Sequence, residues 1–68
     1  MKRAKVVCIS PLYKDITGLI KTFTEGTIYK MTIDHQYYSV INNFGENDFM
    51  DHGYFIRNFE IIRFKYGK

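Results

Sequence analysis

Residues 24–42 read TEGTIYKMTIDHQYYSVIN, and their pattern indicates the fold class more clearly than any other part of the chain. Thr, Ile, Tyr and Val dominate it, and these residue types favour strands with one buried face. In its first half, Tyr29, Met31 and Ile33 alternate with polar residues, which is the period of two that a half-buried strand shows. We therefore predict a hairpin whose parts are residues 27–33, a tight turn at 34–35, and residues 36–42.

Shorter strands are predicted on both sides of this hairpin. An apolar run near the start ends at Pro11, which cannot donate a ladder hydrogen bond. Gly26 suits a turn that needs a positive φ. The additional strands are residues 4–9, 48–50 and 59–66. In the last one, strict alternation places Phe59 and Ile61 on one face, and Ile62, Phe64 and Tyr66 on the other.

Two segments stay open between alternatives. Residues 10–22 read as a long connection, but their apolar residues also fit the spacing of a short helix. Residues 54–58 fit either a tight helical turn or a continued strand. Five short strands with one long loop after the first predict an all-β fold, a small five-stranded barrel that is closed or nearly closed. With 68 residues, the chain has room for one domain, residues 1–68.

The cysteine content indicates a reducing compartment. Cys8 is the one cysteine of the chain, so no intramolecular disulfide forms, and its apolar neighbours predict a small buried hydrophobe. The basic start is followed by only four apolar residues, too few for a secretory signal. No stretch reaches membrane-spanning length. We expect a soluble, intracellular protein without a membrane partner.

The motifs of catalysis and cofactor binding are missing. His52 lies near Asp48 and Asp51, but these residues stand in turn contexts without the fixed spacing of zinc ligands. The five glycines are scattered, so no phosphate-binding loop is present. No nucleophile, base and orienting group form a recognisable set. We expect no catalytic residue, no metal, no cofactor and no enzymatic activity.

The charge is distributed in three blocks, which carry +4 over residues 1–30, −4 over residues 31–56 and +3 over residues 57–68. Such an asymmetry concerns partners rather than fold. In a barrel whose first and last strands are neighbours, the basic ends would gather on one side. Basic side chains with interleaved aromatic rings are typical of a nucleic-acid surface. The candidate residues of this hypothesis are Lys2, Arg3, Lys5, Arg63 and Lys65.

The acidic middle supports a competing hypothesis. Its carboxylates lie beside aromatic residues in predicted turns, and acidic groups around aromatic anchors suit docking on a basic protein surface. The candidate residues are Tyr37, Phe44, Asp48, Phe49 and Asp51. A simpler interpretation accounts for both sets of residues: the charged ends and the turns are solvated and bind no partner. Pairing with a second copy of the chain through strand edges is also open.

A resemblance to a known family covers nearly the whole chain. The segments that carry it are 5–8 (KVVC), 23–29 (FTEGTIY), 38–45 (YSVINNFG) and 59–61 (FEI). In these segments the chain resembles the small Src-homology-3-like proteins of bacteriophages. The resemblance implies a Src-homology-3-like barrel, a phage origin, and the cytoplasm of a bacterial host cell. It carries over no catalytic residue. We therefore predict a non-enzymatic protein that binds and inhibits a host bacterial protein, with nucleic-acid binding as the alternative.

Overall fold

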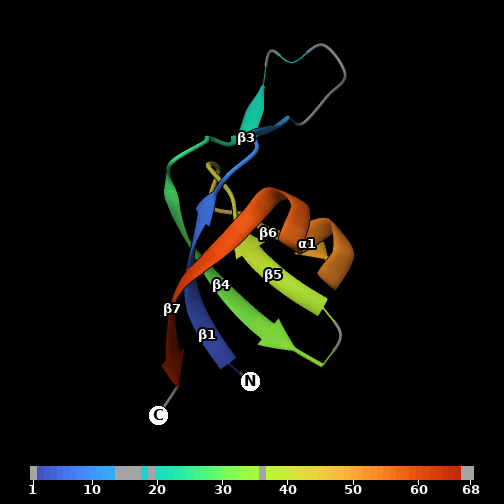
Figure 1. The fold of residues 1–68 in the computed structure, drawn as a ribbon. Coiled ribbons are helices and arrows are strands. Elements are labelled where there is room, and N and C mark those ends of the chain that lie inside the picture. The colour runs from blue at the N-terminus through green and yellow to red at the C-terminus, as the bar shows by residue number, and fades with distance from the viewer. Residues whose placement is uncertain (1, 14–17, 19, 36, 67–68) are drawn as a thin grey trace.

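The computed structural model describes residues 2–13, 18, 20–35 and 37–66 (Figure 1). It contains seven strands and one short helix within these ranges. The elements are β1 (Lys2–Cys8), β2 (Leu12–Tyr13), β3 (Lys21–Phe23), β4 (Ile28–Asp34), β5 (Tyr37–Ile41), β6 (Asn47–Met50), α1 (His52–Asn58) and β7 (Phe59–Tyr66). The predicted all-β class is confirmed.

Five of the strands form one antiparallel sheet in the order β6-β5-β4-β1-β7. The first strand of this sheet therefore lies beside the last, as predicted. Of the predicted forms, closed or nearly closed, full closure is not seen, because β6 and β7 are the two edges and no pairing joins them in the described part of the chain. Between them the chain forms α1, whose Phe55 packs on Phe59 and on Tyr38, so a helix covers this side of the core in place of a strand pair.

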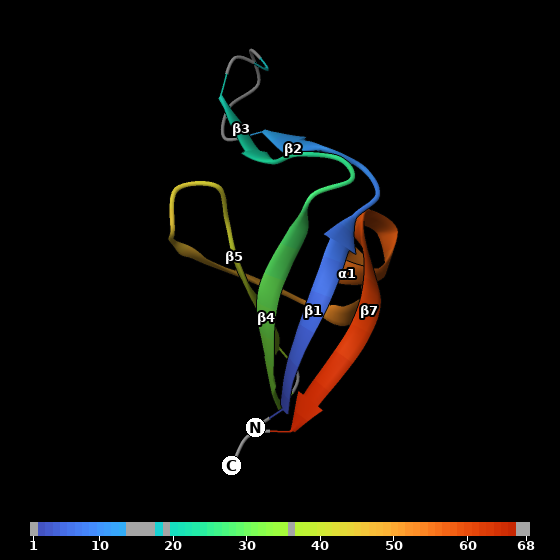
Figure 2. The ribbon, with the colours of Figure 1, turned by 90° about the vertical axis from the view of Figure 1, so that its left-hand side faces the viewer.

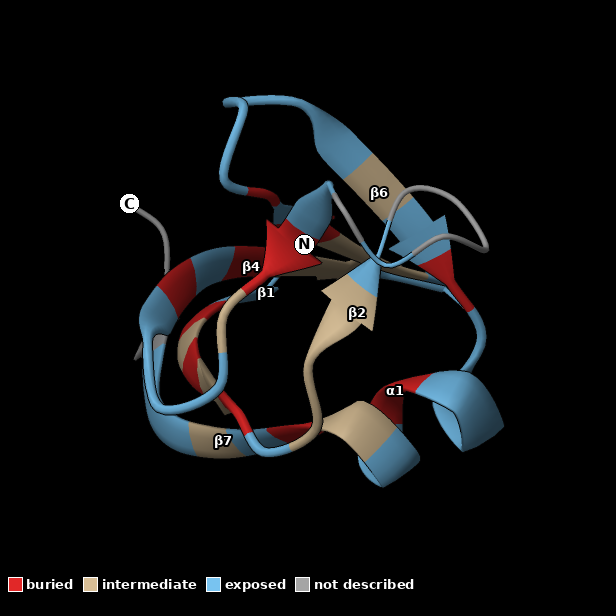
Figure 3. Cartoon of the chain, turned by 90° about the horizontal axis from the view of Figure 1, so that it is seen from above, coloured by how far each residue is buried: buried red, intermediate tan, exposed pale blue. Residues whose placement is uncertain are grey.

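The central hairpin is confirmed with its bounds shifted by one residue. Along β4, Tyr29 and Met31 are buried and Lys30 is exposed, and the alternation appears as red and blue bands in Figure 3. His35 forms the turn between β4 and β5 with a φ of 54°. Gly26 has the predicted positive φ, at 82°, and its N–H donates to the carbonyl oxygen of Cys8 at 2.8 Å.

Aromatic rings build much of the core. The ring of Phe23 meets Tyr29 and Phe59 edge-on, with centroids 4.9 Å apart in both pairs, and Phe55 stacks on Phe59 at 5.5 Å. Such pairs add about 0.5–1.5 kcal/mol each beyond the area they bury. Cys8 is buried as predicted, and burial raises the pKa of its thiol.

The two open segments take definite forms. Residues 52–58 are helical, and the side chain of Asp51 caps the helix by accepting a hydrogen bond from the N–H of Tyr54 at 2.8 Å. In the segment 10–22, β2 and β3 form a two-stranded sheet that stands apart from the main sheet (Figure 2). The alternative of a helix is therefore wrong at Leu12, which lies in a strand. The other positions of the possible helix fall largely on residues 14–17 and 19, outside the described residues.

A bulge in β7 overturns the predicted faces of the last strand. Lys5 lies opposite Arg63, but the next residue of β1, Val6, lies opposite Ile61, so Ile62 is the additional residue of β7. Beyond the bulge, Phe64 lies opposite the buried Ala4. Phe64 therefore faces the same side as Phe59 and Ile61, contrary to the prediction.

Candidate functional site

The face of the five-stranded sheet that turns away from the core is called the outer face below. Strand alternation assigns its residues: those next to Tyr29, Met31, Val40 and Val6 in sequence point outward. Three of its strands, β4, β1 and the edge strand β7, run side by side in Figure 2. The outer face carries four described basic residues, namely Arg3, Lys5, Lys30 and Arg63.

A row of three basic residues crosses the outer face. Lys30 of β4 lies opposite Lys5 of β1, and Lys5 in turn lies opposite Arg63 of β7. Residues directly opposite each other have Cβ atoms about 4.5–5.5 Å apart, and like charges at that distance are destabilising. Lys30 and Arg63 are exposed and Lys5 is partly buried. We call these three residues the basic row.

A second row lies next to it and crosses all five strands. Phe49 of β6 lies opposite Ser39 of β5, Ser39 opposite Thr32 of β4, and Thr32 opposite Arg3 of β1. Lys65 holds the register position opposite Arg3 in β7. We call these five residues the mixed row. It joins an aromatic edge of the sheet to a basic edge.

Arg3 and the basic row have no carboxylate partner among the described residues. Within the described ranges, the only ion pair joins Asp34 to His35, with Nε2 3.5 Å from Oδ1. Neither Arg3 nor any member of the basic row takes part in an ion pair with a described residue. The uncompensated positive charge is therefore available to a negatively charged partner.

The outer face is hollowed along both rows. One hollow, of about 370 Å³, includes Arg3, Lys5 and Lys30 in its lining. A second, of about 900 Å³, is lined by Tyr37 and Phe49 near the β5–β6 edge. The two hollows share three lining residues, so they adjoin, and together we call them the trough, which extends from the aromatic edge to the basic side of the sheet. The shared residues are Thr32, Ser39 and Asn47.

The predicted nucleic-acid residues are largely brought together. Pairing of β1 with β7 gathers Arg3, Lys5 and Arg63 on the outer face, and Lys65 lies at the adjacent register position. Lys2 does not join them. It lies opposite Ile33 and lines a hollow with Tyr38 and Phe64 on the core side of the sheet. Lys2 therefore lies on the opposite face from the rest of the set, because neighbouring residues of a strand point to opposite faces.

Lys30 is the member that sequence reasoning missed. Its alternation with Tyr29 and Met31 shows that it points outward, but only the β4–β1 register shows that it lies beside Lys5.

The predicted protein-docking residues do not form one surface. Tyr37 and Phe49 line the same outer hollow and are 58% and 73% exposed. Phe44 is exposed on the separate turn between β5 and β6. The two carboxylates have structural roles: Asp48 accepts a hydrogen bond from Nδ2 of Asn42 at 3.1 Å, and Asp51 caps α1.

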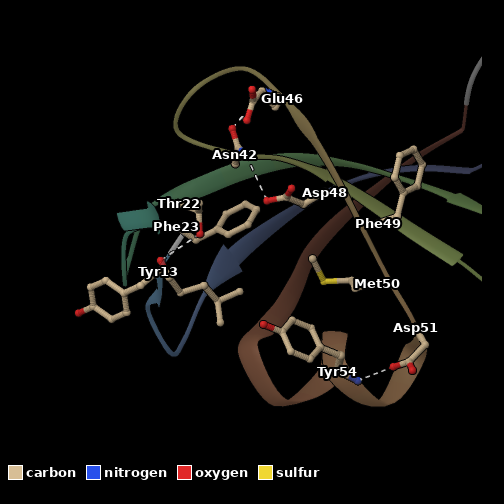
Figure 4. A pocket seen from close by; sticks show the side chains of 11 residues that line it. Tyr13, Thr22, Phe23, Asn42, Glu46, Asp48, Phe49, Met50, Asp51 and Tyr54 are labelled. Carbon is tan, nitrogen blue, oxygen red and sulfur yellow. Dashed lines mark hydrogen bonds between the residues drawn. The ribbon is translucent and has the colours of Figure 1, made fainter. Parts of the chain in front are cut away.

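A cleft on the other side of β6 gathers part of this set (Figure 4). It has a volume of about 530 Å³, and its described lining contains no Lys or Arg. Phe23 and Met50 are its buried apolar residues. The residues around them include both aromatic rings and carboxylates, namely Tyr13, Glu46, Asp48, Phe49, Asp51 and Tyr54.

Three general findings complete the description. In the described ranges, no three His, Cys, Asp or Glu side chains come together in a way that would hold a metal ion. No described helix has the length and apolar character needed to cross a membrane. Comparison of the chain with protein-family models, with curated proteins and with solved structures finds no match.

Proposed function

We propose that this chain binds nucleic acid across the outer face of its sheet. The observation that carries the proposal is the basic row of Lys30, Lys5 and Arg63, with Arg3 beside it and no carboxylate partner among the described residues. Opposed like charges cost the folded chain about 0.2–1 kcal/mol per pair. Phosphates bound between them would reverse the sign of this contribution, because each phosphate is attracted to two or more cations.

Most of the described acidic residues lie outside the trough, which is compatible with this proposal, and Asp34 at its aromatic end is the exception. Glu46, Asp48 and Asp51 line the cleft on the far side of β6 and not the trough. Glu60 of β7 lies opposite Val7 of β1, and it is the carboxylate of the outer face nearest to the basic row in register. A polyanion lying along the rows therefore meets cations first.

We also propose that the fold is a Src-homology-3-like barrel in its strand order. A meander of β4, β5 and β6, a short helix, and a last strand beside the first support this assignment. The phage origin, the bacterial host cytoplasm and the absence of enzymatic activity stay predictions from the sequence.

Nucleic-acid binding is tested by the salt dependence of affinity. A labelled oligonucleotide of about 12 nucleotides is titrated with the protein and followed by fluorescence anisotropy. Four cations on phosphates predict a slope of about −2.8 in log K against log salt for a single strand, so affinity falls roughly 50-fold between about 50 and 200 mM salt.

Charge reversal supplies the matched comparison. Lys30→Glu removes one cation from the basic row and should reduce the salt slope by about 0.7 for a single strand. Lys21→Glu makes the same charge change on β3, outside both rows, and should leave the slope nearly unchanged. Absence of salt-dependent binding, or equal effects of the two variants, would overturn the proposal.

The cleft supports a second candidate function, docking of a basic segment of a host protein. The observation that favours it is the lining of the cleft. Asp48, Phe49 and Asp51 lie there with further aromatic residues, and the described lining contains no Lys or Arg. Charge complementarity and aromatic anchors are both used in protein docking.

The docking candidate has its own test. A pull-down from bacterial lysate after nuclease treatment should retain a discrete protein, and Glu46→Lys should release it. Glu25→Lys, on the exposed turn before β4, serves as the matched control. Loss of all bound material on nuclease treatment would refute docking and agree with nucleic-acid binding.

A further inference from the structure

We propose that the ligand of the outer face is single-stranded nucleic acid, with its phosphates on the basic residues and its unpaired bases on Phe49 and Tyr37. This inference rests on the proposed function and deepens it. It assigns a role to the aromatic edge of the trough, which phosphate binding alone leaves unexplained.

The two rings are placed to act together. Ser39 lies directly opposite Phe49, and Tyr37 is two residues from Ser39 on the same face of β5. Residues in this diagonal relation on neighbouring strands have backbones about 7–8 Å apart, so their aromatic side chains can contact each other. Both line the larger outer hollow, and Phe49 is the most exposed large hydrophobic side chain of the described residues, at 73%. Exposed rings on a sheet are suitable platforms for stacked bases.

The mixed row connects these rings to the cations. Three strand-to-strand steps separate Phe49 from Arg3, which at about 4.8 Å each is a distance of roughly 14 Å. The hydroxyl groups of Ser39 and Thr32 lie between the two ends and can hydrogen-bond to a sugar or a base. The trough therefore offers stacking at one end and charge at the other.

The charge at the aromatic end gives the ligand an orientation. Asp34 lies opposite Tyr37 in the β4–β5 pairing and lines the same hollow. Its carboxylate repels phosphate, but it can accept hydrogen bonds from the amino groups of bases. The His35 ring, 3.5 Å away, compensates this charge only when it is protonated. Bases are thus favoured near the aromatic edge and the backbone near β1 and β7.

A duplex does not satisfy this arrangement. Its base faces are stacked within the helix, so it could contact the cations but would leave the rings of Phe49 and Tyr37 without stacking partners. A polyanion without bases would likewise use only the charged side of the trough. The contribution of the rings therefore distinguishes the three ligands.

The experiment compares a labelled single strand of about 12 nucleotides with a duplex of the same length. The full chain should bind the single strand more tightly at equal salt. Phe49→Leu keeps an apolar side chain but removes the ring, and should weaken single-strand binding about 5- to 100-fold. It should leave the salt slope unchanged, because no charge is lost.

Two further variants make the result specific. Tyr37→Leu is a second test of stacking at the same hollow. Tyr13→Leu removes an exposed ring on β2, outside the trough, and should bind as the unmodified chain does. Circular dichroism checks that each variant is folded.

The outcomes separate this inference from the proposed function. Equal affinity for duplex and single strand, a Phe49→Leu variant that binds like Tyr13→Leu, or equally strong competition by inorganic polyphosphate would each overturn single-strand recognition. In those cases salt-dependent binding would still support the proposed function. No binding to either nucleic acid would overturn both.

Discussion

Replacing Lys5 by Glu should make the folded chain more stable while it weakens anion binding. Lys5 lies between Lys30 and Arg63, so the substitution converts two opposed like-charge pairs into two opposed ion pairs. If Lys5 were selected only for folding, its replacement by Glu would not be expected to stabilise the chain. The prediction therefore connects the proposed binding face with a quantity that requires no ligand.

The magnitude follows from the two pairs. A cross-strand charge pair contributes roughly 0.2–1 kcal/mol, stabilising for opposite charges and destabilising for like charges. Lys30 and Arg63 are exposed, so solvent screening places each change near the lower end. We expect the free energy of unfolding to rise by about 1 kcal/mol, which corresponds to a melting temperature higher by about 4–8 °C for a domain of this size. Lys5→Gln only removes the repulsion and should give about half of this gain.

Urea unfolding followed by circular dichroism measures the effect. The titrations are run at low salt and at about 1 M salt, where the Debye length is about 3 Å and the gain should largely vanish. Lys2→Glu is the matched control, since it makes the same charge change on the same strand at a position opposite Ile33. The reasoning is refuted if Lys5→Glu is no more stable than Lys2→Glu at low salt, or if its gain persists at high salt.

Two further predictions concern Asn42 and Cys8. Asn42 is buried, and its Oδ1 accepts hydrogen bonds from two backbone N–H groups, so Asn42→Asp keeps these but places a second carboxylate beside Asp48. In the folded state, repulsion between the two carboxylates raises the pKa of the pair. Urea unfolding should therefore show a free energy of unfolding lower by about 1.5–3 kcal/mol at neutral pH, and this loss should recover as the pH falls toward about 4. A loss that does not depend on pH would contradict the proximity of the two side chains. Cys8 should resist iodoacetamide in the folded chain and react fully in urea, as mass spectrometry would show, and rapid labelling without urea would contradict its burial. Because burial raises the pKa of this thiol, its contribution to stability is complete below the ordinary thiol pKa of about 8.5 and is lost as the pH rises through the higher folded value.

The local elements of this protein can be read from its amino-acid pattern alone. Period-two alternation and β-favouring residues located the β4–β5 hairpin and β7, Gly26 marked a turn with positive φ, and an apolar run placed Cys8 in the core. These features depend on neighbours within a few residues, so they can be deduced from composition and spacing. The segments 10–22 and 54–58 were ambiguous for the same reason, since short apolar spacings fit both helices and strands.

Which residues share a surface depends on the long-range pairing of the strands. Cross-strand register joins residues that are far apart in sequence, and a shift of one residue moves a side chain to the other face. The bulge at Ile62 sets the faces of Phe64 and Arg63, and pairing of β4 with β1 brings Lys30 beside Lys5. Register also places Phe49 in the same row as Arg3, so residues that the sequence assigned to competing surfaces lie on one outer face. Charge and aromatic content indicate that a binding surface exists, but long-range strand pairing determines its composition.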